Sequence, residues 1–253
     1  MSKLLIPGFR ENSNSAGMIA VKKPIIRSGK YMKFDESGFE VRENLVAPAI
    51  VQTLLAALIQ QKLEPLRGGI RRIEQRVPQV ASLAKSADLL SVAGQYLSDQ
   101  PELVRAIYFD KSPDHNWFVT WHQDRTVAVS DRFEADGWGA WSMKSAAWHV
   151  QPPIDVLQQM VTLRIHLDDA TASNGCLKII PGSHTHGILS NDKIQEKVGQ
   201  EQAVYCEVAA GGAVIMRPHI LHASGKSVAS IPRRILHFEY SSYKLPEGIT
   251  WSA

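Results

Sequence analysis

The chain has 253 residues, of which 44% are hydrophobic and 21% charged, a composition typical of one large globular domain. Its 28 Lys and Arg against 25 Asp and Glu leave a net charge of +3, too small an excess to predict binding to nucleic acid. Cys176 and Cys206 form no CxxC pair, which excludes both a disulfide framework and a thiolate metal site. These features favour a reducing compartment, and we expect a cytoplasmic protein.

Neither a membrane span nor a secretion signal is expected. The longest uncharged run, Asn44 to Gln61, contains Pro48 and several polar residues, which interrupt the roughly 20 apolar residues that a bilayer span requires. The amino terminus has no apolar stretch of useful length before charge and a Pro-Gly pair interrupt it.

The first hundred or so residues predict helical and irregular covering structure. Apolar side chains recur at helical spacing at Ile50, Val51, Leu54, Leu55, Leu58 and Ile59. A second helix is expected after Pro78, with the apolar face Leu83, Ala87, Leu90, Ala93 and Leu97.

From about Leu103 the chain changes to short runs rich in β-branched and aromatic residues. These runs are VRAIYF, WFVTWH, VTLRIHL, CLKII, YCEV, AVIMR and RILHFEY. Their spacing predicts a sandwich or barrel. No repeat and no Gly- or Ser-rich linker divides the sequence, so we expect a single domain, 1–253, with residues 1–100 covering a β core at about 103–245.

A candidate metal site lies at the end of the WFVTWHQD run. The period of two in a strand directs His122 and Asp124 to the same face. A third ligand must come from far along the chain, and we favour His222 over His219, which directly follows Pro218. Two imidazoles and one carboxylate form a facial triad with open positions, the arrangement of non-haem Fe(II) oxygenases. Open positions suit O₂ and a chelating co-substrate.

Two arginines lie eleven and twelve residues beyond His222, in IPRRILHFEY. A guanidinium buried beside an iron site binds a dicarboxylate bidentately, which suggests 2-oxoglutarate as the co-substrate. Ser224 can add a hydroxyl hydrogen bond to the same carboxylate. Strand alternation sends Arg233 and Arg234 to opposite faces, so at most one is the clamp, and the spacing alone leaves the choice open.

The order WHQD, LDDATASNGCLKIIPGSH, MRPHILHAS and PRRILHFEY, across about Ile107 to Tyr240, resembles the phytanoyl-CoA dioxygenase family of Fe(II)/2-oxoglutarate oxygenases. The resemblance implies a mainly β fold with flanking α-helices, a double-stranded β-helix or cupin-like jelly roll. It also implies that the metal motif of the family falls on His122, Asp124 and His222. The 2-oxoglutarate arginine of the family lies eleven residues after the distal histidine, which selects Arg233, and Ser224 matches a serine of the family.

The same resemblance implies a reaction with O₂ that converts 2-oxoglutarate to succinate and CO₂ and hydroxylates a C–H bond of a small-molecule substrate. Asp124 separates the chain from related halogenases, which carry a small residue at that position. Desaturation and ring formation by the same chemistry stay open as outcomes.

Three more residues, Arg164, Asn116 and Thr120, are candidates for contacts with the co-substrate. Arg164 stands where the best-known family member has an aromatic residue, and we expect it to bind a second 2-oxoglutarate carboxylate or an acidic group of the substrate. The alternative is an outward-facing residue paired with Asp168 or Asp169. Asn116 and Thr120 precede the metal motif and reach the co-substrate if they face inward.

Substrate selection is expected in the segment GWGAWSMKSAAWHVQPP. Its aromatic and polar side chains suit a pocket or lid, and the candidates are Trp138, Trp141, Trp148, His149 and Gln151. The alternative is that the tryptophans pack a loop against a sheet.

The remaining polar residues in this part of the chain have structural interpretations. Turn chemistry is expected at Asn174, Gly175, Pro181, Gly182 and Ser183. His184 and His186 do not indicate a second metal site, and we expect His166 and His237 to satisfy local hydrogen bonds.

Two rival functions compete with an oxygenase. A cupin-like metal enzyme of another reaction class explains the triad but gives Arg233 no task. A non-catalytic binding protein on the same fold leaves the intact His-Asp-His set without a packing reason.

Overall fold

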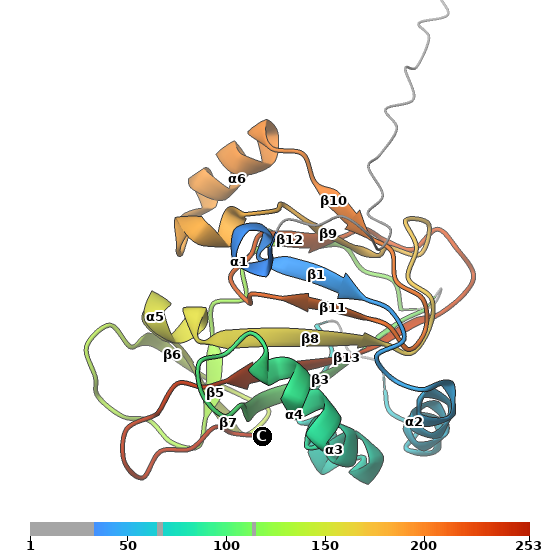
Figure 1. Ribbon diagram of the computed structural model, residues 1–253, viewed down its shortest axis with the longest axis horizontal. Helices are drawn as coiled ribbons and strands as arrows, with labels where there is room; N and C mark the ends of the chain where they lie inside the picture. Colours follow the sequence, from blue (N-terminus) through green and yellow to red (C-terminus); the bar gives the residue numbers. More distant parts are fainter. Residues whose placement is uncertain (1–32, 65–67, 113–114) are drawn as a thin grey trace, which may run out of the picture.

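The computed structural model describes residues 33–64, 68–112 and 115–253 (Figure 1). The amino-terminal segment, in which no secretion signal is expected, lies outside these residues. The described part contains two facing antiparallel sheets, a third small sheet and flanking helices. This arrangement confirms the predicted mainly β fold of the jelly-roll type. No helix in the described part of the chain is long and apolar enough to cross a bilayer.

The larger sheet has the strand order β1-β11-β8-β13-β3-β2. Its strands are β1 (Phe39–Arg42), β2 (Ile70–Arg71), β3 (Glu102–Lys111), β8 (Met160–His166), β11 (Ala213–Met216) and β13 (Arg233–Ser241). Strand β13 pairs along its whole length with β3 and for most of it with β8. It therefore forms the centre of the sheet and aligns side chains from three strands in rows across it.

The smaller sheet faces the larger one and has the order β10-β9-β12-β4. Its strands are β4 (Val119–His122), β9 (Leu177–Ile179), β10 (Val204–Cys206) and β12 (His222–Ser224). Phe39, Val214 and Met216 of the larger sheet pack against Leu177 and Ile179 of the smaller one. A third sheet contains β5 (Val127–Val129), β7 (Ala147–Gln151) and β6 (Gly139–Lys144), in that order.

Helices cover the outer faces of both facing sheets. The α-helices are α1 (Phe34–Ser37), α2 (Pro48–Gln60), α3 (Pro78–Ala84), α4 (Ala87–Gly94), α5 (Ile154–Gln158) and α6 (Asn191–Gln200), and the 3₁₀ helices are η1 (Ile73–Gln75) and η2 (Ser183–His186). Apolar side chains of α2, α3 and α4 share one core with the outer face of the larger sheet, and α3 and α4 lie over β8, β13 and β3 in Figure 1. Ile194 of α6 packs with Ile180 and Leu221 beside the smaller sheet.

Strand alternation divides β13 between these two environments. Leu236 and Phe238 are fully buried in the core under the helices. Arg233 and His237 point to the opposite face, which we call the inner face because it faces the interior between the sheets. A single strand thus supplies apolar stabilisation on one side and charged chemistry on the other.

The structure confirms the seven predicted strands and refines the helical region. The helix expected after Pro78 is two helices, because the first ends at Ala84 and Ser86 caps the second, its Oγ accepting a hydrogen bond from Leu89 N at 3.3 Å. The expectation of only helical and irregular structure before residue 100 was wrong at β1 and β2. These short strands pair with β11 and β3 at the edges of the larger sheet.

Replacing Phe238 by Ala tests the outer core. Phe238 is fully buried, so the truncation removes apolar contacts and leaves a cavity, and the free energy of unfolding should fall by about 3–5 kcal/mol. Urea denaturation measures the change. Val228→Ala is the control, because Val228 is 87% exposed and its truncation should change stability by no more than about 0.5 kcal/mol. Equal effects of both variants would contradict this description of the core.

Candidate metal and co-substrate site

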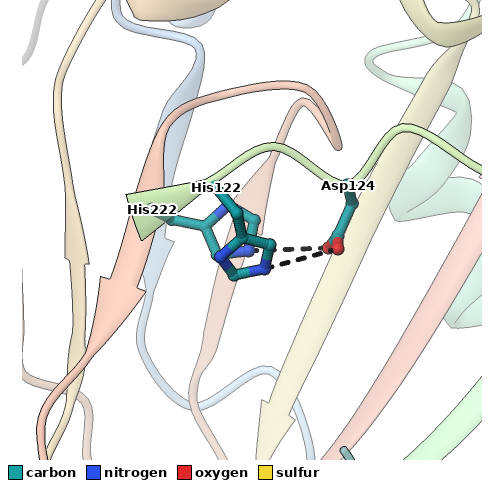
Figure 2. A group of neighbouring side chains, drawn as sticks. All are labelled: His122, Asp124 and His222. Atoms are coloured by element: carbon teal, nitrogen blue, oxygen red, sulfur yellow. Dashed lines mark ion pairs between the residues drawn. The ribbon is translucent and has the colours of Figure 1, made fainter. Parts of the chain in front are cut away.

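The three predicted metal ligands come together at one pair of strands. His122 ends β4 and His222 begins β12, and the two residues are direct partners in the antiparallel register. Asp124 follows β4, and its backbone N–H donates to Pro218 O at 3.0 Å. Figure 2 shows both imidazoles directed at the carboxylate, with His122 Nε2 3.6 Å from Asp124 Oδ1 and His222 Nε2 3.5 Å from Asp124 Oδ2.

Backbone carbonyls orient both imidazole rings. His122 Nδ1 lies 2.8 Å from Thr120 O, and His222 Nδ1 lies 2.9 Å from Ile220 O. A carbonyl can only accept, so each Nδ1 carries a proton, and in the neutral ring each Nε2 presents a lone pair toward Asp124. The ligand atoms lie within 4.8 Å of one another. This donor set fits a divalent metal ion held by two histidines and one carboxylate.

Electrostatics favour the metal-binding protonation states of Asp124 and His222 but oppose that of His122. Burial alone would raise the pKa of Asp124, but the hydrogen bond from His122 and the charge of both imidazoles lower it well below its usual range. Burial, assisted by the nearby His122, lowers the pKa of His222 to about 3. Burial opposes protonation of His122 as well, yet the contact with Asp124 outweighs it and raises the His122 pKa. At neutral pH, proton competition with a metal therefore falls mainly on His122.

The other histidines considered as metal ligands, His219, His184 and His186, lie outside the metal site. The ring of His219 is 6.1 Å from that of His184, on centroids, and neither belongs to a metal-ligand cluster among the described residues. His186 is exposed and also outside any such cluster in the described part of the chain.

A second cluster, formed by Asp124, His237 and Glu239, also has donor atoms within 4.8 Å. His237 Nε2 is 2.9 Å from Glu239 Oε1, and the same oxygen accepts a hydrogen bond from Arg105 Nη2 at 2.7 Å. Because these atoms already bond to one another, the triad of His122, Asp124 and His222 fits a metal better.

The triad lines a cavity of about 400 Å³ whose wall includes residues from all three sheets. Arg233 enters this cavity from the start of β13 and is 3% exposed. Its Nη2 donates to Ser224 Oγ at 3.3 Å, while Nε and Nη1 have no hydrogen-bond partner among the described residues. Buried donors without partners are costly, so this fork of N–H groups fits a carboxylate ligand.

The neighbouring Arg234 points the other way. Its Nε and Nη2 donate to the two carboxylate oxygens of Asp168 at 2.8 and 2.7 Å. The prediction that the two arginines face opposite sides is confirmed, and only Arg233 faces the cavity.

Sequence reasoning missed Lys111, which is 1% exposed and lies opposite Arg233 in the β3–β13 register. Its Nζ donates to Ser224 Oγ at 3.0 Å and to Gly225 O at 2.8 Å. Burial, followed by the charges of Arg233 and Arg164, lowers the pKa of Lys111 to about 7. A lysine at a strand end is usually a surface residue, and its pairing with Arg233 was the signal that could have identified it.

Ser224 connects the two cations, since its hydroxyl donates to Gly175 O at 2.9 Å and accepts from both. Gly175 has φ 76°, and a Cβ on it would lie 2.4 Å from Gly225 O. Only glycine fits here, which supports the expected turn role of this residue.

Arg164 also belongs to the cavity, and the outward-facing alternative is wrong. The side chain is 7% exposed, and Asp168 pairs with Arg234 instead. Arg164 Nη1 lies 2.7 Å from His237 Nδ1, and its Nε has no partner among the described residues. Burial lowers its pKa to about 10. The strand alternation of β8 places Arg164 on the inner face.

Neither Asn116 nor Thr120 reaches the cavity with its side chain. Asn116 bonds the backbone of Ser227 through both ends of its amide, at 2.6 and 2.8 Å. His222 pairs with His122, but Ser224 pairs with Val119, so β4 contains one extra residue, a β-bulge. The bulge turns Val119 into the cavity and leaves Thr120 exposed. Neither side chain therefore faces the cavity, and the condition for the co-substrate contacts predicted for them is not met.

The segment expected to form a lid is an ordered hairpin of β6 and β7. His149 and Gln151 line the cavity as predicted. Trp141 and Trp148 do not, because they stack edge to face with centroids 6.2 Å apart in an apolar cluster that also contains Trp138. The packing interpretation thus holds for the tryptophans.

Arg72 ties the tip of this hairpin to β2, since its Nη1 donates to the carbonyls of Ser145 and Ala146 at 3.4 and 3.2 Å.

The two remaining histidines differ. His237 satisfies hydrogen bonds with Arg164 and Glu239, as expected. The same expectation was wrong for His166, which is fully buried with neither ring nitrogen bonded to a described residue. Burial, with the charges of Arg233 and Arg164, lowers its pKa well below the usual range and keeps it neutral.

Comparison with known proteins identifies the lineage. The model of the phytanoyl-CoA dioxygenase (PhyH) family matches residues 34–235. Phytanoyl-CoA dioxygenase 1 of Oryza sativa subsp. japonica is 24% identical over 185 residues, which cover 69% of this chain and 56% of the relative. Ectoine dioxygenase of Nocardia farcinica is 21% identical over 254 residues, covering 86% of this chain and 78% of the relative. The chain spans about half the length of the phytanoyl-CoA dioxygenases it matches.

Solved structures share the fold. The non-heme alpha ketoglutarate dependent carbocyclase SnoK from nogalamycin biosynthesis superposes with a TM-score of 0.63 at 14% identity, covering 82% of this chain and 81% of that one. HygX from Streptomyces hygroscopicus, with nickel and 2-oxoglutarate bound, gives a TM-score of 0.60 at 15% identity, covering 85% and 86%. Likeness at this identity shows the architecture alone. Because the family model matches most of its length, the chain belongs to the phytanoyl-CoA dioxygenase family.

Proposed function

We propose that this protein is an Fe(II)- and 2-oxoglutarate-dependent dioxygenase that oxidises a C–H bond of a small organic molecule, with release of succinate and CO₂. The observation that carries the proposal is a single cavity containing both the His-Asp-His donor set and the Arg233 N–H groups that have no partner among the described residues. Neither feature requires the other for packing, and together they match the needs of one chelated dicarboxylate.

Each side chain has a defined task in this proposal. His122, Asp124 and His222 hold the metal on one face and leave the other positions open. Arg233 and Lys111 bind the far carboxylate of 2-oxoglutarate, and Ser224 holds both cations in place through its hydroxyl. The bound iron and co-substrate supply the oxidising chemistry, while the protein supplies orientation and exclusion of water.

The relatives support this choice of chemistry. The similar proteins include an ectoine dioxygenase and an alpha ketoglutarate dependent carbocyclase and epimerase, and HygX was solved with 2-oxoglutarate and nickel. These outcomes differ, so the family fold does not select one product. Asp124 retains the carboxylate ligand, which favours hydroxylation over halogenation.

The rival functions leave parts of the cavity unexplained. A cupin-like enzyme of another class has no use for a buried guanidinium with two empty donor positions. A binding protein without catalysis has no use for two imidazoles with matched tautomers directed at one carboxylate.

Metal binding should depend on pH in a direction set by His122. The ligands must be deprotonated to bind a metal, and Asp124 raises the pKa of His122 above its usual value. Below this raised pKa, the affinity for Co(II) should fall by about tenfold per pH unit, and above it the affinity should become constant. Calorimetric titration between pH 5 and 8 measures this dependence.

The same titration with variants tests the ligand set. His222→Ala should weaken Co(II) binding by more than about 100-fold, because loss of a ligand exceeds the 10- to 100-fold effect of outer residues. His186→Ala is the matched control, since His186 is exposed and outside the cluster. Unchanged binding by His222→Ala would exclude the proposed site.

Co-substrate binding should depend on Arg233 and not on Arg234. Under anaerobic conditions, Fe(II) and 2-oxoglutarate should give a weak visible absorption from the chelate. Arg233→Gln should raise the dissociation constant for 2-oxoglutarate by about 30-fold or more, since removing one partner of a buried charge pair costs about 2–5 kcal/mol. Arg234→Gln removes the same charge on the opposite face and should leave the absorption titration unchanged.

Turnover provides the second readout. With 2-oxoglutarate and O₂ present, the iron-loaded protein should form succinate, and the His122→Ala variant should form none.

In the absorption titration, an unchanged affinity of Arg233→Gln for 2-oxoglutarate would show that Arg233 does not bind the carboxylate.

A further inference from the structure

Cationic side chains dominate the cavity wall beyond what the metal and 2-oxoglutarate require. The positively charged residues on the wall are Arg71, Arg105, Lys111, Arg125, Lys144, Arg164 and Arg233. Among the described lining residues, Asp124 alone is acidic. The proposed function uses Asp124 for the metal and Arg233 with Lys111 for the co-substrate. Five cations remain around the space left for the substrate.

Most of the five already have partners. Arg105 Nη2 donates to Glu239 at 2.7 Å, Arg125 Nη1 donates to Leu189 O at 3.3 Å, and Arg164 Nη1 bonds His237. Lys144 is exposed, so water screens its charge. Arg71 differs from these, because its guanidinium forms no hydrogen bond and no ion pair with a described residue, and its Nε is buried.

The sheet register separates Arg71 from the carboxylate clamp. Arg71 pairs with Ile107, Ile107 pairs with His237, and His237 pairs with Arg164, which places Arg71 and Arg164 at the two ends of one row across the inner face. Arg233 and Lys111 form another row, four residues away along β13 and β3. At about 3.3 Å per residue, the two rows are roughly 13 Å apart at the backbone.

The backbone holds Arg71 close over β3. Gly69, directly before β2, has φ 79°, and a Cβ on it would lie 2.6 Å from Ile107 and 2.8 Å from Phe109. The chain can approach the inner side chains of β3 this closely because glycine stands there. Arg71 lines the same cavity as the metal ligands. Burial, followed by the charge of Arg105, lowers the pKa of Arg71, and the charges of Asp124 and Glu239 oppose this shift.

We propose that the substrate is a small organic anion whose carboxylate or phosphate group binds Arg71. A half-buried guanidinium without a direct ion-pair partner is unfavourable, and an oxyacid group supplies both the adjacent charge and the paired acceptors that it lacks. Arg125 and Lys144, on the same wall, increase the local positive potential and disfavour cationic substrates. This inference rests on the proposed function, because it takes Arg233 and Lys111 as occupied by 2-oxoglutarate.

Paramagnetic relaxation in NMR tests the proposal with the Mn(II) protein saturated with 2-oxoglutarate. The probes are benzoate, phenyl phosphate and the uncharged match benzamide. When a probe binds near the paramagnetic Mn(II) ion, its protons relax much faster. We expect enhancement for at least one anion and little for benzamide, and the comparison of benzoate with phenyl phosphate distinguishes a carboxylate site from a phosphate site.

Three variants test whether the anion binds at Arg71. Arg71→Gln should weaken binding of the anion by about tenfold or more, because a charge-assisted hydrogen-bonded contact is lost. Arg71→Lys keeps the charge and should restore part of the affinity, which separates recognition from misfolding. Arg76→Gln makes the same charge change at an exposed residue outside the cavity wall and should have no effect.

Calorimetry of 2-oxoglutarate binding on the same samples separates this inference from the proposed function. If 2-oxoglutarate binds but the anions are relaxed no more than benzamide, or equally in Arg71→Gln, the anionic substrate is excluded and the oxygenase function stands. If 2-oxoglutarate does not bind to the Mn(II) protein at all, both proposals are overturned.

Discussion

The hydrogen-bonded pairing of β4 with β12 is the constraint on which the site depends. It sets His122 opposite His222, and the backbone carbonyls beside them fix which nitrogen of each ring is free. A shift of one residue in this register would send one imidazole to the other face of the sheet. The pairing of two short strands therefore determines whether the chain can hold a metal at all.

The larger sheet places several charged side chains in the interior of the protein. Its outer face joins a continuous apolar core with α2, α3 and α4. Its inner face carries Arg105, Arg164 and Arg233 together with Glu239 and His237. Burial of unpaired cations opposes folding, and the apolar packing on the other face of the same strands offsets that cost. Some of the donors are left for ligands to satisfy.

Patterns within single segments predicted much of this protein. Alternating β-rich runs predicted the strands, and the two-residue spacing of His122 and Asp124 predicted that they share a face. The choice of His222 as their partner came from its place at the end of a later β-rich run and from the family resemblance. Alternation also predicted that Arg233 and Arg234 face opposite sides.

What the sequence did not predict depends on pairing between distant segments. Lys111 gains its position only through its register with Arg233, and the bulge that exposes Thr120 exists only against β12. The contrast between His149 and its neighbour Trp148 follows from which face of the hairpin meets the cavity. Local pattern carries no information on such relations.

The hairpin of β6 and β7 is structurally separate from the strands that carry the metal ligands. It belongs to a sheet separate from the strands that bear the metal ligands and the carboxylate clamp, and Arg72 fastens its tip to β2. The cavity-facing residues His149 and Gln151 of this hairpin can therefore change without altering the β4–β12 register that places the metal ligands. The hairpin is thus a place where the shape of the cavity can diverge between members of one fold while the metal ligands stay fixed.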